Sequence, residues 1–290
     1  MEGIRGPIVH RQSSFILLLA LGLIAPMAVA QMDLAGTWTQ RMHEDLGERG
    51  QGPDMGDYTG LPINDAARFR AESFSPLRWT VPEHQCEPHP IDYAPLGPAH
   101  ALIRSEIDPN TFEVIAWHIT YSWMTPTQTI WMDGREHPSE YEAHTWMGFS
   151  MGQWEGDILV VRITHLKEGW IRRNGIPRSD LAEVAQYWIR HGDILQLVTV
   201  IEDPVYLSEP SVRSVAWEAN PGYTMGPYTC SARVEIERPQ GYVPHFLPGE
   251  NPLLQDYSSN SGVPREAALG GAETQYPEYM DVLSELLSSQ

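Results

Sequence analysis

Short hydrophobic runs separated by turn signals dominate the chain from about residue 100 to residue 237. β-Branched and aromatic residues are concentrated in these runs, which is typical of strands. We expect strands at 36–42, 100–107, 112–123, 127–132, 148–154, 158–165, 183–190, 194–202, 211–218 and 228–237. Turn sequences such as Asp133-Gly134 separate them. Because no helical pattern lies between the runs, the sequence predicts a mainly β fold, an antiparallel up-and-down meander closed as a barrel.

The predicted strands are apolar on both faces. In the run 112–123, one face carries Trp117 and Ile119, and the other carries Val114 and Ala116. A sheet with one face in water would show a cleaner alternation of apolar and polar residues. Burial of both faces fits a barrel with a filled or ligand-holding interior, whose outside is covered by long irregular segments.

Two irregular regions can supply that cover. Glycines and prolines interrupt residues 41–98, where only a short helix at 66–71, capped by Asn64 or Asp65, is expected. A stretch of this length without strands is typical of a lid, a binding loop or an extended wrap. We therefore expect a single β-barrel-like domain at 31–237, with 41–98 as an irregular insertion. Residues 238–290 should form an extended arm and a C-terminal helix packed outside the barrel.

The first thirty residues have the layout of a secretory signal peptide. Arg5 and Arg11 precede an apolar run at 15–23, and the small residues Ala28 and Ala30 suit a cleavage site before residue 31. This run is too short to span a bilayer, and no other stretch approaches about 20 apolar residues. We predict an exported protein, periplasmic or secreted, with a signal peptide at 1–30 and no membrane span.

The net charge restricts the partners. The chain has 38 acidic and 19 basic residues, a formal net charge of −19 and a pI near 4.9. A folded chain this acidic repels the phosphate backbone of nucleic acids and anionic membrane surfaces. We therefore expect no nucleic-acid partner and favour a small-molecule ligand or substrate; the oligomeric state stays open.

The chain has two cysteines, Cys86 and Cys230. Because an exported chain meets an oxidising compartment, these two cysteines can pair. We expect a disulfide bond between them, and two free buried thiols are the alternative.

Five motifs are spread over the chain after the signal peptide. They are Leu34-Ala35-Gly36-Thr37-Trp38, Ile130-Trp131-Met132-Asp133-Gly134-Arg135, Trp154-Glu155-Gly156-Asp157-Ile158-Leu159-Val160, Arg172-Arg173-Asn174-Gly175-Ile176-Pro177 and Ile201-Glu202-Asp203-Pro204-Val205-Tyr206. Together they resemble a family of exported bacterial proteins of unassigned function, a resemblance that implies no particular activity or catalytic residue. The chain is also similar to lipocalin-like barrels, whose first strand begins with glycine-x-tryptophan, as Gly36-Thr37-Trp38 does here. This similarity implies a lipocalin-like barrel.

One group of polar residues is expected to converge at a rim of the barrel. Alternate connections of a meander lie at the same end, so the loops at 133–144 and 168–180 should share a rim. A histidine at the mouth of an apolar cavity can exchange a proton near neutral pH, and an arginine can polarise a carbonyl oxygen. We assign His144, His165 and Arg172 as candidate catalytic residues. In the alternative interpretation, the arginines only pair with acidic side chains.

Candidate ligand-binding residues are tryptophans on or beside the strands and polar residues of the second loop: Trp117, Trp131, Trp146, Arg173 and Asn174. An aromatic-lined cavity suits a flat or hydrophobic ligand, although core packing explains the same tryptophans. The histidines lack the spacing of known metal motifs, so we expect no metal and no cofactor. A site of nitrogen and oxygen ligands would require Asp133, His137 and His144 to converge at the rim.

Three functions are compatible with these features. The first is an exported barrel that binds a small, largely apolar or aromatic molecule in its interior. The second is a cofactor-free hydrolase, isomerase or lyase that uses a rim histidine with arginine support. The third is an interaction module of the cell envelope, with the proline- and glycine-rich arms as its recognition surface. The chain contains no Gly-x-Ser-x-Gly motif, phosphate-binding loop or dinucleotide-binding fingerprint.

Overall fold

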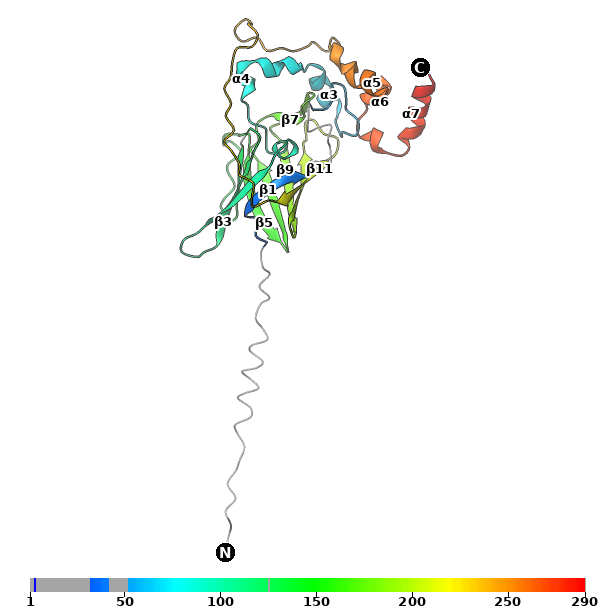
Figure 1. The fold of residues 1–290 in the computed structure, drawn as a ribbon. Helices are drawn as coiled ribbons and strands as arrows, with labels where there is room; N and C mark the ends of the chain where they lie inside the picture. Colours follow the sequence, from blue (N-terminus) through cyan, green and yellow to red (C-terminus); the bar gives the residue numbers. More distant parts are fainter. Residues whose placement is uncertain (1–2, 4–31, 42–51, 125, 290) are drawn as a thin grey trace. The chain divides into compact units, whose positions relative to one another are not determined.

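Nine strands of the described residues form a closed barrel in the order β1-β11-β10-β9-β6-β5-β4-β3-β2 (Figure 1). They are β1 (Gly36–Arg41), β2 (Ala101–Ile107), β3 (Val114–Tyr121), β4 (Thr127–Trp131), β5 (Phe149–Glu155), β6 (Ile158–Thr164), β9 (Glu183–His191), β10 (Ile194–Glu202) and β11 (Ser211–Ala219). The computed structural model describes residue 3 and residues 32–41, 52–124 and 126–289. The predicted signal peptide therefore lies, except for Gly3, outside the described residues.

The barrel closes because β1 pairs with both β11 and β2. The predicted mainly β barrel is thereby confirmed. One pair departs from the antiparallel meander: β4 and β5 run parallel, with Ile130 opposite Ser150 and Trp131 opposite Met151. The long connection 132–148 allows this arrangement, because a parallel neighbour needs a chain that returns to the end where the first strand began. The predicted strand at 228–237 is absent, and these residues are neither strand nor helix.

Side chains of the strands fill the interior of the barrel. The Trp188 and Trp217 rings stack with centroids 5.8 Å apart, and the Trp217 indole donates to the Ala99 carbonyl oxygen at 2.7 Å. Gln128 and Gln186, both fully buried, are joined by a hydrogen bond of 2.9 Å. The largest fully buried side chains of these strands are Trp38, Ile103, Ile119, Tyr121, Ile130, Leu159, Trp188 and Trp217. The interior is therefore a packed core built from the alternate residues that face inward, and the other face of these strands is only partly buried.

A cap of short elements covers one end of the barrel (Figure 1). It contains α3 (Asp65–Glu72), η1 (Pro76–Thr80), α4 (Pro82–Gln85), η2 (Ala94–Leu96), β7 (Gly169–Arg172) and β8 (Ile176–Arg178). Because β6 and β9 are antiparallel neighbours, the β7–β8 hairpin between them must stand at the end where β6 finishes. The Asn64 side chain accepts from the Ala67 backbone N–H at 3.1 Å, so the predicted capped helix is confirmed.

A buried ion pair joins two parts of the cap. The Arg178 Nε lies 3.0 Å from an Asp92 carboxylate oxygen, and both side chains are almost completely buried. Arg178 also donates to the carbonyl oxygens of Ser179 and Lys167. Because Arg178 finds three acceptors without water, it fixes the β7–β8 hairpin to the segment that carries Asp92.

An extended arm, residues 220–251, returns from β11 to the cap. Cys86 and Cys230 form the predicted disulfide bond, which ties this arm to the end of α4. The short elements η3 (Pro252–Gln255), α5 (Asp256–Ser261), α6 (Arg265–Ala268), η4 (Ala272–Gln275) and α7 (Tyr279–Ser288) follow. Residues Met32–Gln290 cluster as one compact unit. Helix α7 packs against η4 and buries none of its residues completely.

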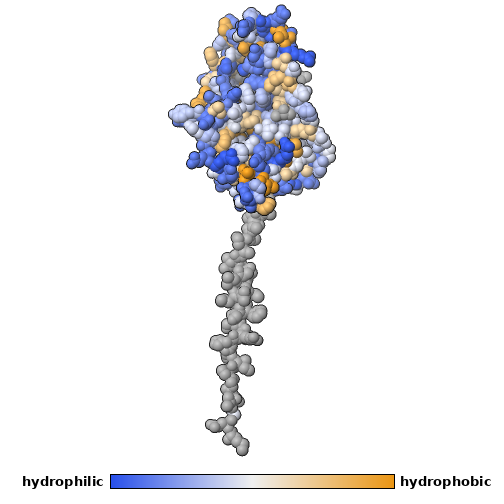
Figure 2. All heavy atoms as spheres, turned by 90° about the vertical axis from the view of Figure 1, so that its left-hand side faces the viewer, coloured by the Kyte–Doolittle hydropathy of each residue, from blue (hydrophilic) through white to orange (hydrophobic). Residues whose placement is uncertain are grey.

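The surface carries small hydrophobic groups among hydrophilic residues on the face seen in Figure 2. Within the described ranges, no helix has the length and hydropathy to cross a membrane.

Candidate functional site

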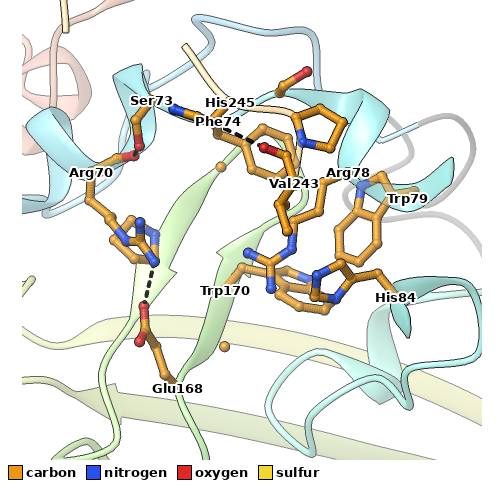
Figure 3. A pocket seen from close by; sticks show the side chains of 15 residues that line it. Arg70, Ser73, Phe74, Arg78, Trp79, His84, Glu168, Trp170, Val243 and His245 are labelled. Atoms are coloured by element: carbon orange, nitrogen blue, oxygen red, sulfur yellow. Dashed lines mark hydrogen bonds and ion pairs between the residues drawn. The ribbon is translucent and has the colours of Figure 1, made fainter. Parts of the chain in front are cut away.

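A cavity of about 360 Å³ opens in the cap (Figure 3). Its walls come from three segments that are far apart in the sequence: residues 70–84, residues 168–177 around the β7–β8 hairpin, and residues 243–245 of the arm. We call this cavity the cap cleft. It lies outside the packed core of the barrel, so its walls, unlike the core residues, can contact a ligand.

Local backbone requirements hold the three walls together. Gly175 has φ +102°, and a Cβ at this position would lie 2.5 Å from the Phe74 Cβ, so only glycine allows the close contact. On the other side, Phe74 forms a β-bridge with His245, and the Phe246 backbone N–H donates to the Ser73 carbonyl oxygen at 3.0 Å. The chain after α3 is thereby held between the hairpin and the arm.

Aromatic rings form one wall of the cap cleft. The Trp79 and Trp170 rings meet edge to face, with centroids 4.8 Å apart and an interplanar angle of 70°. The Phe74 ring lies 6.3 Å from Trp79, and the Arg173 guanidinium lies 5.1 Å from the centroid of the Trp79 ring. The two indoles are too close to admit a ring between them, so a flat ligand would lie against the wall that they present.

Most charges of the cap cleft are paired. The Arg70 guanidinium lies 3.2 Å from Glu168, and the His84 Nδ1 lies 2.9 Å from Glu87. The Arg78 guanidinium, in contrast, has no hydrogen bond or ion pair with any residue that the structure describes, and its Nε is buried. Figure 3 shows Arg70 and Glu168 on one side of the cleft and Arg78, Trp79 and His84 on the other. The cleft therefore keeps one cation that the described chain does not neutralise.

A second unsatisfied donor lies in the same wall. Trp170 is 8% exposed, and its indole Nε1 is buried without a hydrogen-bond partner among the described residues. Behind it, Tyr93 contacts both Trp170 and His89. Burial, with a smaller contribution from the charge of Arg173, lowers the pKa of His89 to about 3, so this imidazole is neutral at neutral pH.

The predicted catalytic histidines meet at the rim beside the cap. The His165 ring lies 5.4 Å from the His144 ring and 5.5 Å from the His137 ring, centroid to centroid. A bridge between Thr145 and Leu166 joins the two loops. We call His137, His144 and His165 the histidine cluster. His165 has φ +57°, a left-handed conformation that is uncommon for residues other than glycine.

Hydrogen bonds define the tautomers of the cluster. The His144 Nδ1 lies 2.9 Å from the Leu166 carbonyl oxygen, and the His165 Nε2 lies 2.9 Å from the Ser139 carbonyl oxygen. A carbonyl oxygen can only accept a hydrogen bond, so the His144 Nδ1 and the His165 Nε2 must both donate. When neutral, His144 therefore presents its Nε2 as a proton acceptor, whereas the remaining nitrogen of His165 is occupied by the Thr164 hydroxyl at 2.8 Å.

The other predicted catalytic residue has different neighbours. Arg172 lies 3.5 Å from the Asp57 carboxylate, and the Asn174 amide donates to the carbonyl oxygens of Asp54 and Asp57 at 3.1 and 2.9 Å. These contacts fasten the hairpin to the loop at 54–57. The pairing of an arginine with an acidic residue matches the alternative interpretation given for this loop.

The predicted ligand-binding residues are dispersed. Trp117 is 3% exposed and belongs to the core. The Arg135 guanidinium lies 3.3 Å from the centroid of the Trp131 ring, and Trp146 lies beside Lys167 and Trp170. Through its contact with Trp79, Arg173 touches the wall of the cap cleft. Across the described residues, no group of three or more His, Cys, Asp or Glu side chains is arranged to hold a metal ion.

The sequence reasoning missed the residues of the cap cleft. Phe74, Arg78 and Trp79 lie in the insertion at 41–98, for which a lid or binding loop was one expectation, without residues being assigned. The signal that could have indicated these residues is an arginine next to a tryptophan, Arg78-Trp79, in an irregular segment. No family model, curated protein or solved structure matches the chain, so the resemblance to exported bacterial proteins stays a prediction.

Proposed function

We propose that this protein binds a small, largely apolar or aromatic molecule, and that the binding site is the cap cleft. The observation that supports this most is the edge-to-face pair Trp79–Trp170 in the wall of a cavity of about 360 Å³. Cavities of about 300–1,000 Å³ with aromatic walls and a few polar groups are typical of small-molecule sites. The interior of the barrel is filled by its own tryptophans, so the cleft in the cap is the better site.

An exported location fits this proposal. The Cys86–Cys230 disulfide is of the kind that persists in oxidising compartments. We infer that the chain acts in the periplasm or outside the cell, where a binding protein meets small molecules before they enter. The acidic surface does not oppose a ligand without large negative charge.

The variant Trp79→Ala tests the proposed site. We expect it to weaken the binding of a neutral aromatic probe, 2-naphthamide, about five- to tenfold, because one ring of the aromatic wall is lost. Isothermal titration calorimetry measures the affinity directly. Trp131→Ala is the matched control, since Trp131 contacts Arg135 away from the cleft and should leave the affinity unchanged.

Two measurements complete this experiment. Native mass spectrometry of the chain isolated from its own source should detect a bound molecule that Trp79→Ala does not retain. Thermal unfolding of both variants separates a lost contact from a lost fold. Equal binding of the probe by the parent chain and Trp79→Ala would refute the cap cleft as the site.

A second candidate function is acid–base catalysis at the histidine cluster. It is favoured by the free Nε2 of His144, whose other ring nitrogen is held by the Leu166 carbonyl oxygen. In this proposal His144 takes the proton as general base, and His165 positions the loop that carries Leu166. The reaction class is a cofactor-free hydrolysis, isomerisation or elimination.

Replacing His144 tests the second candidate. In a screen of aryl ester substrates, His144→Ala should lower any turnover by at least about a hundredfold, the usual contribution of a positioned general base. His191→Ala provides the control, because His191 is exposed at the end of β9. If the two variants retain the same rate, the histidine cluster has only a structural role.

A further inference from the structure

We propose that the ligand of the cap cleft carries a carboxylate group, which binds to the Arg78 guanidinium and the Trp170 indole N–H. This inference rests on the proposed function and narrows its ligand class to aromatic or apolar carboxylic acids. The inference is supported by two buried hydrogen-bond donors in the lining of one cavity, Arg78 Nε and Trp170 Nε1. Neither has an acceptor among the described residues.

The first step concerns the charge of Arg78. The chain contains twice as many acidic as basic residues, so an arginine has many carboxylates available as partners. In the cap cleft, Glu168 pairs with Arg70 and Glu87 pairs with His84, yet no carboxylate of the described chain reaches Arg78. Arg78 is therefore an unpaired cation inside a cavity of an acidic protein. Such a cation is suited to bind an anionic group of a ligand.

The second step concerns the cost of unmet hydrogen bonds. A buried donor without an acceptor destabilises the folded chain, and such groups are rare in folded proteins. Arg78 Nε and Trp170 Nε1 are two such donors, and both residues line the same cavity. In this proposal one carboxylate of the ligand accepts from both side chains, and its binding removes two penalties at once.

The third step selects the kind of anion. A guanidinium has a planar fork of N–H donors that matches the two oxygens of a carboxylate. A doubly charged phosphate ester would call for a second free cation, but Arg70 is engaged by Glu168 at 3.2 Å. The indole and phenyl rings of Trp79, Trp170 and Phe74 provide the apolar surface for the rest of the molecule.

A pair of probes of equal shape tests the proposal. Isothermal titration calorimetry compares 2-naphthoate with 2-naphthamide, which differ in the charge of one group. We expect the parent chain to bind the naphthoate at least tenfold more tightly than the amide, as charge-assisted hydrogen bonds predict. Arg78→Gln should abolish this preference, so that the two probes bind this variant with affinities within about twofold of each other.

Control variants sharpen the outcome. Arg104→Gln removes the same charge from an exposed position on β2 and should keep the preference for the naphthoate. Arg78→Lys keeps the charge but loses the planar fork, so part of the preference should disappear. Phenyl phosphate serves as the competing anion and should bind more weakly than 2-naphthoate.

Failure of the inference and failure of the proposed function give different results. If both naphthalene probes bind equally and Trp79→Ala weakens both, the cleft binds aromatic molecules but the carboxylate proposal is wrong. If neither probe binds, or if Trp79→Ala changes neither affinity, the proposed function itself is refuted. A preference for the naphthoate that survives in Arg78→Gln would overturn the assignment of Arg78.

Discussion

Replacing Cys86 and Cys230 together by alanine should lower the free energy of unfolding by about 4–5 kcal/mol. The disulfide joins residues 144 positions apart, and the loop that it closes contains most of the barrel. In the chain-entropy account, a bond that closes so long a loop removes much of the freedom of the unfolded chain. Equilibrium unfolding in urea, monitored by tryptophan fluorescence, measures this difference.

The double variant avoids the free thiol that a single substitution would leave. The parent chain treated with a reductant should show the same loss, which separates the effect of the bond from that of the side chains. A loss below about 1 kcal/mol would mean that the unfolded chain is already compact or that the bond strains the folded state.

The buried pair Asp92–Arg178 gives the second large effect. Asp92→Asn leaves the Arg178 charge buried without a counterion, so we expect the free energy of unfolding to fall by about 3–5 kcal/mol. Glu168→Gln is the matched control, because it breaks the exposed Arg70–Glu168 pair, in which each side chain is 52% exposed. An exposed pair contributes at most about 1 kcal/mol.

Chemical denaturation of the two variants under identical conditions provides the comparison. Similar losses for Asp92→Asn and Glu168→Gln would contradict the structural role given to Arg178. Because Arg178 lies on β8, amide hydrogen exchange should also show that Asp92→Asn loosens the β7–β8 hairpin before it loosens the barrel.

The barrel could be predicted from the sequence because its signals are local. The runs of β-branched and aromatic residues correspond closely to the nine strands, and Asn64 identifies the start of α3. The disulfide followed from the presence of two cysteines in a chain with an expected signal peptide. The strands and the helix depend on residues that are close together in the sequence, and the disulfide depends on the number of cysteines. One sequence is therefore sufficient to predict them.

The parallel pair β4–β5 had no such local signal. Asp133-Gly134 is typical of a tight hairpin, but the chain continues to residue 148 before it re-enters the sheet beside Trp131. Which side a long connection takes is decided by what it packs against, here the loop at 165–167 through the Thr145–Leu166 bridge.

The candidate site was harder still to predict. The loops of His144 and His165 do meet, because one enters β5 and the other leaves β6 at the same end of these antiparallel neighbours, but Arg172 is held by Asp57 on another loop. The cap cleft combines residues near 75, 170 and 244, and no spacing in a single sequence indicates that they meet. Arg78 becomes conspicuous only when its lack of a partner among the described residues is seen.

Because three segments form the wall of the cap cleft, ligand affinity depends on how tightly these segments are docked against one another. A ligand that contacts all three segments binds only when the insertion, the β7–β8 hairpin and the arm are docked together. It would act as a reversible crosslink between them, much as the Cys86–Cys230 bond is a permanent one. By mass action, ligand at a hundredfold excess over its Kd would add about 2.7 kcal/mol to the docked state. The cap should therefore be most ordered where its ligand is abundant and loosen where it is scarce.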